Sequence, residues 1–215
     1  MPIILNLLRD ASIYSIFVLL VTVLILLIFI GKIKDRDLQL FTYLWLPIAA
    51  LTQYLMTYFR ISLGESNLPI MNIYLMIEFI LLVFILLNIR KRKKGIVPNY
   101  KIWSVVLAGG ILIHFTDELD SLHIPAILYM SIIYFNISVS FIDLERANLL
   151  FKDPYTILNI GVFLKAFGYS YISIYQIDFN FPLYIHTAVN LLVQVVFTIA
   201  IFVYYREMKK EKKYL

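Results

Sequence analysis

The sequence contains no cysteine. This absence excludes disulfide bonds, thiolate catalysis and cysteine-ligated metal or iron–sulfur centres. Charge is also scarce, because Asp, Glu, Lys and Arg make up only 15% of the residues, whereas 61% are hydrophobic and the mean hydropathy is +0.84. A soluble domain of this length cannot bury that much apolar surface. The composition therefore predicts an integral membrane protein with lipid around its helices.

The balance of charge is basic, with a net charge of +5 and a pI of about 9.2. The basic residues stand in short runs between apolar stretches, which is the pattern of membrane topology. We therefore expect no nucleic-acid partner. The first ten residues, MPIILNLLRD, lack the basic start of a signal peptide, and the apolar run that follows is too long for its core. This run is predicted to be a retained first membrane helix.

Seven apolar runs are separated by charged or turn-forming residues, and a helix needs about 20 residues to cross the hydrocarbon. The fold class is therefore predicted to be all-α, a polytopic seven-helix bundle forming one membrane domain over 1–215 with no soluble domain. The predicted spans are Ala11–Gly31, Leu38–Arg60, Ile70–Ile89, Ile102–Asp117, Leu122–Leu144, Pro154–Tyr175 and Pro182–Tyr205. The fourth is the weakest, because it is short and contains Gly109–Gly110; if it does not span, the topology after it inverts.

Lysine and arginine are concentrated in alternate loops, which predicts the orientation of the chain. The basic loops contain Lys32, Lys34 and Arg36, then Arg90 to Lys94 with Lys101, then Arg146 and Lys152, and finally the C-terminal tail. Short basic loops remain in the cytoplasm. We therefore expect the N-terminus outside, the C-terminus in the cytoplasm, and a location in a bacterial cytoplasmic (inner) membrane.

A short internal similarity suggests a repeat. The segment from Glu65 to Ile70 resembles the segment from Asp178 to Leu183, and each leads into a predicted helix at a constant offset. This offset overlays helices one to three on helices five to seven, a 3+1+3 parallel plan found in small transporters. Proline after an Asn cap is also a common helix start, so an ordinary pair of helix beginnings explains the same pattern.

Two ionisable residues lie at membrane depth, where charges are costly and usually mark a functional site. Glu78 and Lys165 are predicted at similar depths below the outer surface. Other polar residues of the outer half are predicted to line the same pocket, namely Gln53, Tyr74, Asn190 and His186. Polar residues also serve as simple hydrogen-bonding contacts between helices, and an ion pair can be purely structural.

A second polar group contains all three histidines of the chain. It consists of His114, Asp117, Glu118, Asp120, His123 and His186. Histidine and carboxylate ligands around a metal could activate water, with His114, Asp117 and His186 as the candidate ligands. Acidic outer loops also result when Lys and Arg are kept inside, and no HExxH signature is present.

These features favour a small-molecule-binding membrane protein of transporter or receptor type, more consistent with a non-enzyme than with an enzyme. We expect a small polar or zwitterionic ligand at an outward-facing pocket and no cofactor. One alternative is a membrane-embedded metal-dependent hydrolase; another is a non-catalytic membrane subunit. The basic loops are expected to contact anionic lipid, and a protein partner or a homo-oligomer is compatible with the sequence. No motif set of a known seven-helix family is complete in this chain.

Overall fold

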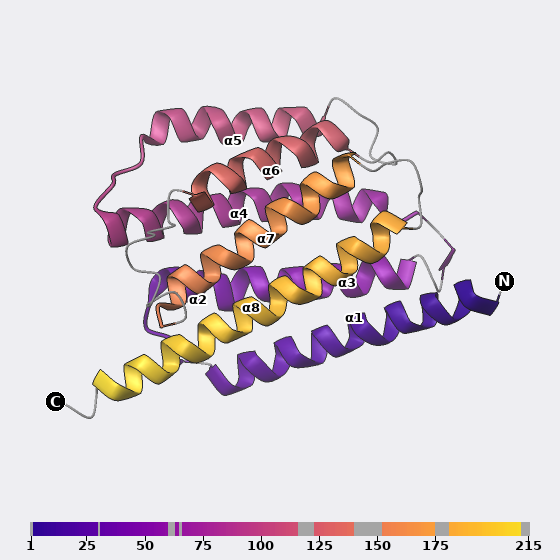
Figure 1. The fold of residues 1–215 in the computed structure, drawn as a ribbon, viewed down its shortest axis with the longest axis horizontal. Helices are drawn as coiled ribbons and strands as arrows, with labels where there is room; N and C mark the ends of the chain where they lie inside the picture. Colours follow the sequence, from indigo (N-terminus) through magenta and orange to yellow (C-terminus); the bar gives the residue numbers. More distant parts are fainter. Residues whose placement is uncertain are drawn as a thin grey trace. The chain divides into compact units, whose positions relative to one another are not determined.

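The computed structural model describes residues 2–29, 31–59, 63–64, 66–115, 123–139, 152–174 and 181–211, with side chains described for part of these ranges. All regular structure in these ranges is helical, which confirms the predicted all-α class. The helices are α1 (Pro2–Phe29), α2 (Arg36–Leu40), the π-helix η1 (Phe41–Trp45), α3 (Leu46–Tyr58), α4 (Leu68–Lys94), α5 (Tyr100–His114), α6 (Ile124–Val139), α7 (Pro154–Ile174) and α8 (Phe181–Glu211). Because α2, η1 and α3 follow one another without a break, the described ranges contain seven continuous helices (Figure 1).

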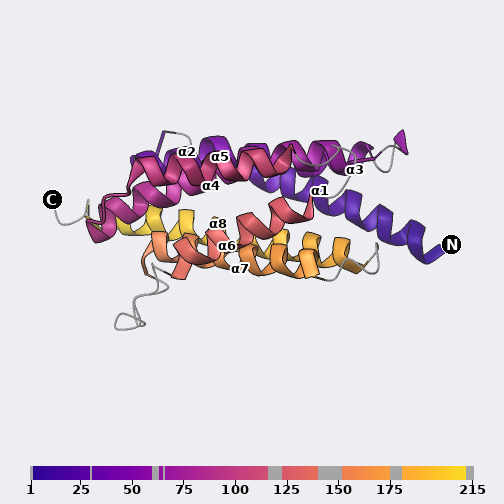
Figure 2. The same cartoon turned by 90° about the horizontal axis from the view of Figure 1, so that it is seen from above.

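The chain divides into two compact units. Unit 1 comprises Met1–Leu82 and Leu107–His123, and unit 2 comprises Val83–Val106 and Ile124–Leu215. In unit 1, α1 packs against α3, and in unit 2, α7 packs against both α6 and α8 (Figures 1 and 2). The single membrane domain expected over 1–215 stays a prediction.

The π-helix η1 ends two residues before Pro47, which is the second residue of α3. The N–H of Leu46 bonds to the carbonyl of Phe41, five residues earlier, as in a π turn. Proline has no N–H to continue the α-helical hydrogen bonding, and π turns are one way in which helices accommodate such a break. The helix around Pro47 therefore contains a widened turn.

Polar contacts stabilise the end of α1 and the start of α2 in unit 1. Asp35 caps α2, since its Oδ1 accepts hydrogen bonds from the N–H groups of Asp37 and Leu38. The hydroxyl of Tyr43 donates to the carbonyl of Phe29 at 2.5 Å, which satisfies one of the last carbonyls of α1. Gly31, with φ of 68°, provides the left-handed residue that ends this helix.

Close packing of α7 against α8 in unit 2 depends on two glycines. A Cβ at Gly161 would lie 2.3 Å from Cε1 of Phe197, and a Cβ at Gly168 would lie 2.6 Å from Cγ1 of Val189. The residue numbers of these contacts increase along α7, from 161 to 168, and decrease along α8, from 197 to 189. The two helices are therefore antiparallel. The absence of a side chain at both glycines therefore permits the close approach of α7 and α8.

Membrane-crossing capacity differs among the helices. Within the described residues, one helix, Leu68–Lys93, is both long enough and apolar enough to cross a membrane by these two criteria. Within the same residues, three shorter apolar stretches of helix are Ile16–Phe29, which is the end of α1, Tyr100–His114 and Ile124–Val139. The 15 residues of α5 rise about 22 Å, which is short of the ~30 Å of hydrocarbon. The fourth predicted span is therefore the weakest because its helix is short.

Candidate functional site

The structure places Lys165 on α7, inside unit 2. Its side chain is only 2% exposed, and its Nζ lies 5.5 Å from the ring centroid of Tyr169, one turn later. The ring of Tyr169 lies 6.4 Å from that of Tyr134 on α6, and both tyrosines are buried. The lysine therefore lies at the α6–α7 side of the unit next to an aromatic pair, where ring quadrupoles attract a cation.

The antiparallel register of α7 and α8 also defines the level of Lys165. The contacts of Gly161 with Phe197 and of Gly168 with Val189 lie one on each side of it. The midpoint of these contacts on α8 is at Val193, which lies between Asn190 and Gln194 in the sequence. Asn190 and His186 belong to α8, but their side chains lie outside the described set. The backbone thus places Lys165 level with the stretch of α8 that was predicted to be polar.

Asn159, one and a half turns before Lys165, joins α7 to α6. Its Nδ2 donates to the carbonyl of Ser138 at 3.0 Å, and both residues are buried. This is the interhelical hydrogen bond that polar residues make in membrane bundles. The Oδ1 of Asn159 and the Oγ of Ser138 are buried without a hydrogen-bond partner. Two buried polar atoms near one end of unit 2 thus retain hydrogen-bonding capacity.

Glu78 belongs to unit 1 and is fully buried in α4, with 0% exposure. Tyr74, one turn earlier on the same helix, is also buried. The next residue, Phe79, has its ring against Gly110 of α5, where a Cβ would lie 2.4 Å from Cε1. Gln53, on α3 of the same unit, is half-buried. Of the six predicted site residues, unit 1 thus contains Gln53, Tyr74 and Glu78, while Lys165, His186 and Asn190 belong to unit 2.

The two histidines at the end of α5 and the start of α6 meet in unit 1. Nδ1 of His114 lies 3.2 Å from Nδ1 of His123, and both rings are buried. At this distance one imidazole donates its N–H to the other. Nε2 of His114 is buried and has no hydrogen-bond partner.

The hydrolase alternative required His114, Asp117 and His186 around a metal. Asp117 lies outside the described residues, as do Glu118 and Asp120, and so does the side chain of His186. Among the described side chains, no group of three or more His, Asp or Glu residues could hold a metal ion. The pairing that the structure does show, of His114 with His123, was not predicted, since these two residues were considered only as members of a possible metal site.

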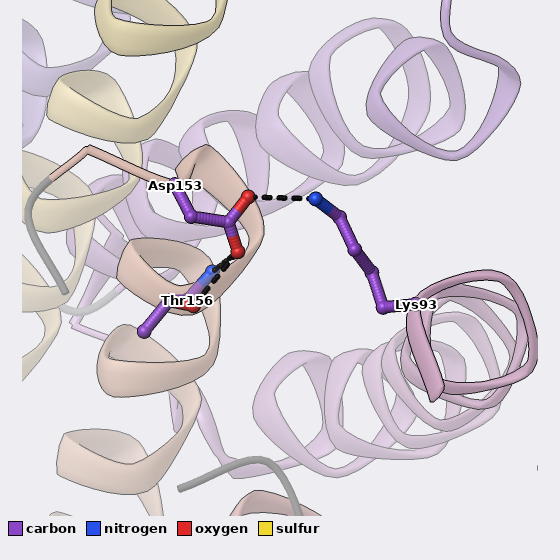
Figure 3. A network of polar contacts seen from close by, with 3 residues as sticks. All are labelled: Lys93, Asp153 and Thr156. Carbon is purple, nitrogen blue, oxygen red and sulfur yellow. Dashed lines mark hydrogen bonds and ion pairs between the residues drawn. The ribbon is translucent and has the colours of Figure 1, made fainter. Parts of the chain in front are cut away.

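An ion pair joins the end of α4 to the start of α7 in unit 2 (Figure 3). Nζ of Lys93 bonds to Oδ1 of Asp153 at 2.9 Å, and Oδ2 of Asp153 accepts from the N–H and the hydroxyl of Thr156. Asp153 is therefore the cap of α7 as well as the partner of Lys93. Sequence reasoning missed this contact, although an Asp followed by a Pro at a helix start is the signal for such a cap.

Comparison with known proteins adds no further assignment. No protein-family model, curated protein or solved structure matches the chain.

Proposed function

We propose that the chain is a multi-pass integral membrane protein that binds a small polar or zwitterionic molecule, with Glu78 and Lys165 as the charged binding residues. The observation that carries the proposal is the burial of two ionisable side chains within apolar helices. Charges in such places are costly and are retained mainly for function. Gln53, Tyr74, Asn190 and His186 are proposed as the polar residues that assist them.

The distribution of apolar side chains supports a lipid environment. Several helices expose large apolar residues at spacings of three and four, which form one stripe along each helix. The stripes are Phe17, Leu20, Leu24 and Leu27 in α1, Leu128, Ile132, Phe135 and Val139 in α6, and Leu192, Val195, Ile199 and Phe202 in α8. Extended exposed apolar surface is typical of contact with lipid or with another protein. Lipid accounts most simply for stripes on this many helices.

The contact between Lys93 and Asp153 supports the proposed topology. It brings the end of α4 and the start of α7 together within unit 2. If α5 and α6 each cross the membrane once, these two ends return to the same side. With the basic loops in the cytoplasm, that side is the inner one, and the N-terminus is outside.

The binding proposal can be tested by thermal unfolding of detergent-purified protein against a panel of free amino acids, betaines and polyols. We expect at least one compound to raise the Tm of the wild type. Lys165→Met and Glu78→Gln should fold but bind that compound at least about tenfold more weakly, since each removes a charge-assisted contact. The matched controls are Lys152→Met and Glu207→Gln, which make the same changes at an exposed and a partly exposed position away from the predicted pocket and should bind normally. Normal binding by either site variant, or a panel in which nothing binds, contradicts the proposal.

The topology can be tested directly because the chain has no cysteine. Single cysteines placed at Ser66, Val97 and Lys152, all exposed, report on three loops. We expect a membrane-impermeant thiol reagent to label Ser66→Cys in intact cells, but Val97→Cys and Lys152→Cys only after permeabilisation. Labelling of Lys152→Cys in intact cells would instead mean that the chain crosses an odd number of times between α4 and α7.

A further inference from the structure

The end of α4 and the start of α7 form a strongly basic junction in unit 2. Residues 83–106 include six basic side chains and no acidic one. Within the described parts of 83–106 and 124–174, the one acidic residue is Asp153. Its carboxylate is already engaged, with one oxygen on Lys93 and the other on Thr156 (Figure 3). Within these described segments the one carboxylate is therefore already engaged, and Glu207, in α8 of the same unit, is paired with Arg206 and Lys210.

Two of these cations gather at one aromatic ring. Nζ of Lys93 lies 4.6 Å from the ring centroid of Tyr155, and Cζ of Arg92 lies 5.3 Å from the same centroid. Each contact is favourable by itself, but two like charges at one ring repel each other. The side chains of Lys93 and Asp153 are 46% and 28% exposed, so a ligand can reach them. Asp153 already offsets the charge of Lys93, and a second anion beside Tyr155 would reduce the remaining repulsion.

The strongest evidence for an anion-binding site at this junction comes from Arg90. It precedes Lys93 by three residues and so lies on the same side of α4. Its Nε is buried and has no hydrogen-bond partner. Arginine remains protonated at any physiological pH, and a buried charged donor without an acceptor is costly. Among the described residues no acceptor satisfies this Nε, so the junction retains an unmet hydrogen-bond donor.

We propose that this junction, formed by Arg90, Arg92, Lys93 and Tyr155, binds the phosphate of an anionic phospholipid headgroup. The planar guanidinium matches the geometry of a phosphate. Tyrosine is typical of the membrane–water interface, and a basic cluster at the cytoplasmic end of a membrane helix attracts anionic lipid. The inference rests on the proposed membrane location, because this location brings headgroups to the ends of α4 and α7.

The test compares the effects of lipid on Tm in protein purified in a neutral detergent. Phosphatidylglycerol in mixed micelles should raise the Tm of the wild type by about 2–4 °C more than phosphatidylcholine does. Arg90→Gln should lose most of this difference, with binding at least roughly tenfold weaker. Lys91→Gln is the matched control: it removes the same charge from the exposed neighbouring residue and should retain the difference.

Three outcomes would overturn the site. Equal effects of the two lipids would exclude selectivity for anionic headgroups, and equal losses in Arg90→Gln and Lys91→Gln would reduce the effect to general charge attraction. An equal rise of the Tm with inorganic phosphate would assign the site to a soluble anion instead.

If Arg90→Gln does not fold, native mass spectrometry of the wild type and of Arg92→Gln decides, since the amount of retained phosphatidylglycerol should fall in the variant. Carbonate extraction separates the two proposals: a protein that stays in the membrane without lipid selectivity contradicts only the lipid site.

Discussion

Gly161→Ala is expected to destabilise the protein by about 1–3 kcal/mol, although alanine is the better helix former. The added Cβ would lie 2.3 Å from Cε1 and 2.7 Å from Cδ1 of Phe197. Phe197 is fully buried, so its ring cannot swing into solvent to make room. Either α7 moves away from α8 or the ring leaves its preferred rotamer, and both cost more than the ~1 kcal/mol gained in helix propensity. Thermal unfolding in detergent should show a fall in Tm of several degrees.

A double-mutant cycle provides the control for this prediction. Phe197→Leu alone creates a void and should also destabilise. In the combination of Gly161→Ala with Phe197→Leu, the smaller side chain leaves space for the new methyl group, so the combined loss should be smaller than the sum of the single losses. Strictly additive losses would mean that Gly161 and Phe197 do not contact each other.

The helices could be predicted from the sequence because their apolar runs are long and sharply bounded. Pro154 begins α7 as predicted, and Pro69 and Pro182 each stand second in their helices. The largest differences are at charged ends. The first helix begins at Pro2 instead of Ala11, and the last continues to Glu211 beyond Tyr205. Arg, Glu, Met and Lys are good helix formers, so a helix can extend past the apolar run that predicted it.

The site was less predictable, because it depends on how each helix is rotated about its axis. In the structure, Gly161 and Gly168, one on each side of Lys165 in the sequence, pack against α8. The sequence alone does not reveal that Phe197 and Val189 are their partners, since these side chains resemble any other apolar residues of α8. The contact of Lys93 with Asp153 joins residues 60 positions apart. Such pairings arise from tertiary packing, which local periodicity does not specify.

Ile132→Asp is expected to prevent stable insertion of the protein. Ile132 is 53% exposed in the middle of α6, within the apolar stripe of that helix. If the stripe faces lipid, an aspartate at the helix centre costs about 2.5–3.5 kcal/mol in insertion. If the stripe instead faced water, an exposed substitution of this kind would change stability by about 0.5 kcal/mol or less. The free-energy cost of Ile132→Asp is therefore much larger if the stripe faces lipid than if it faces water.

The measurement is the amount of folded protein in carbonate-washed membranes, assayed by size-exclusion chromatography in detergent. Ile132→Ala is the matched control, because it removes apolar area at the same position without adding charge, and it should accumulate almost normally. Asp at this position should reduce the folded membrane fraction severely. Accumulation of Ile132→Asp as folded protein in detergent-free buffer would contradict a membrane location, because a charge at the centre of a lipid-facing helix cannot be neutral. The exposed stripes of α1, α6 and α8 would then have to be surfaces for other proteins, the remaining environment in which so much apolar surface is stable.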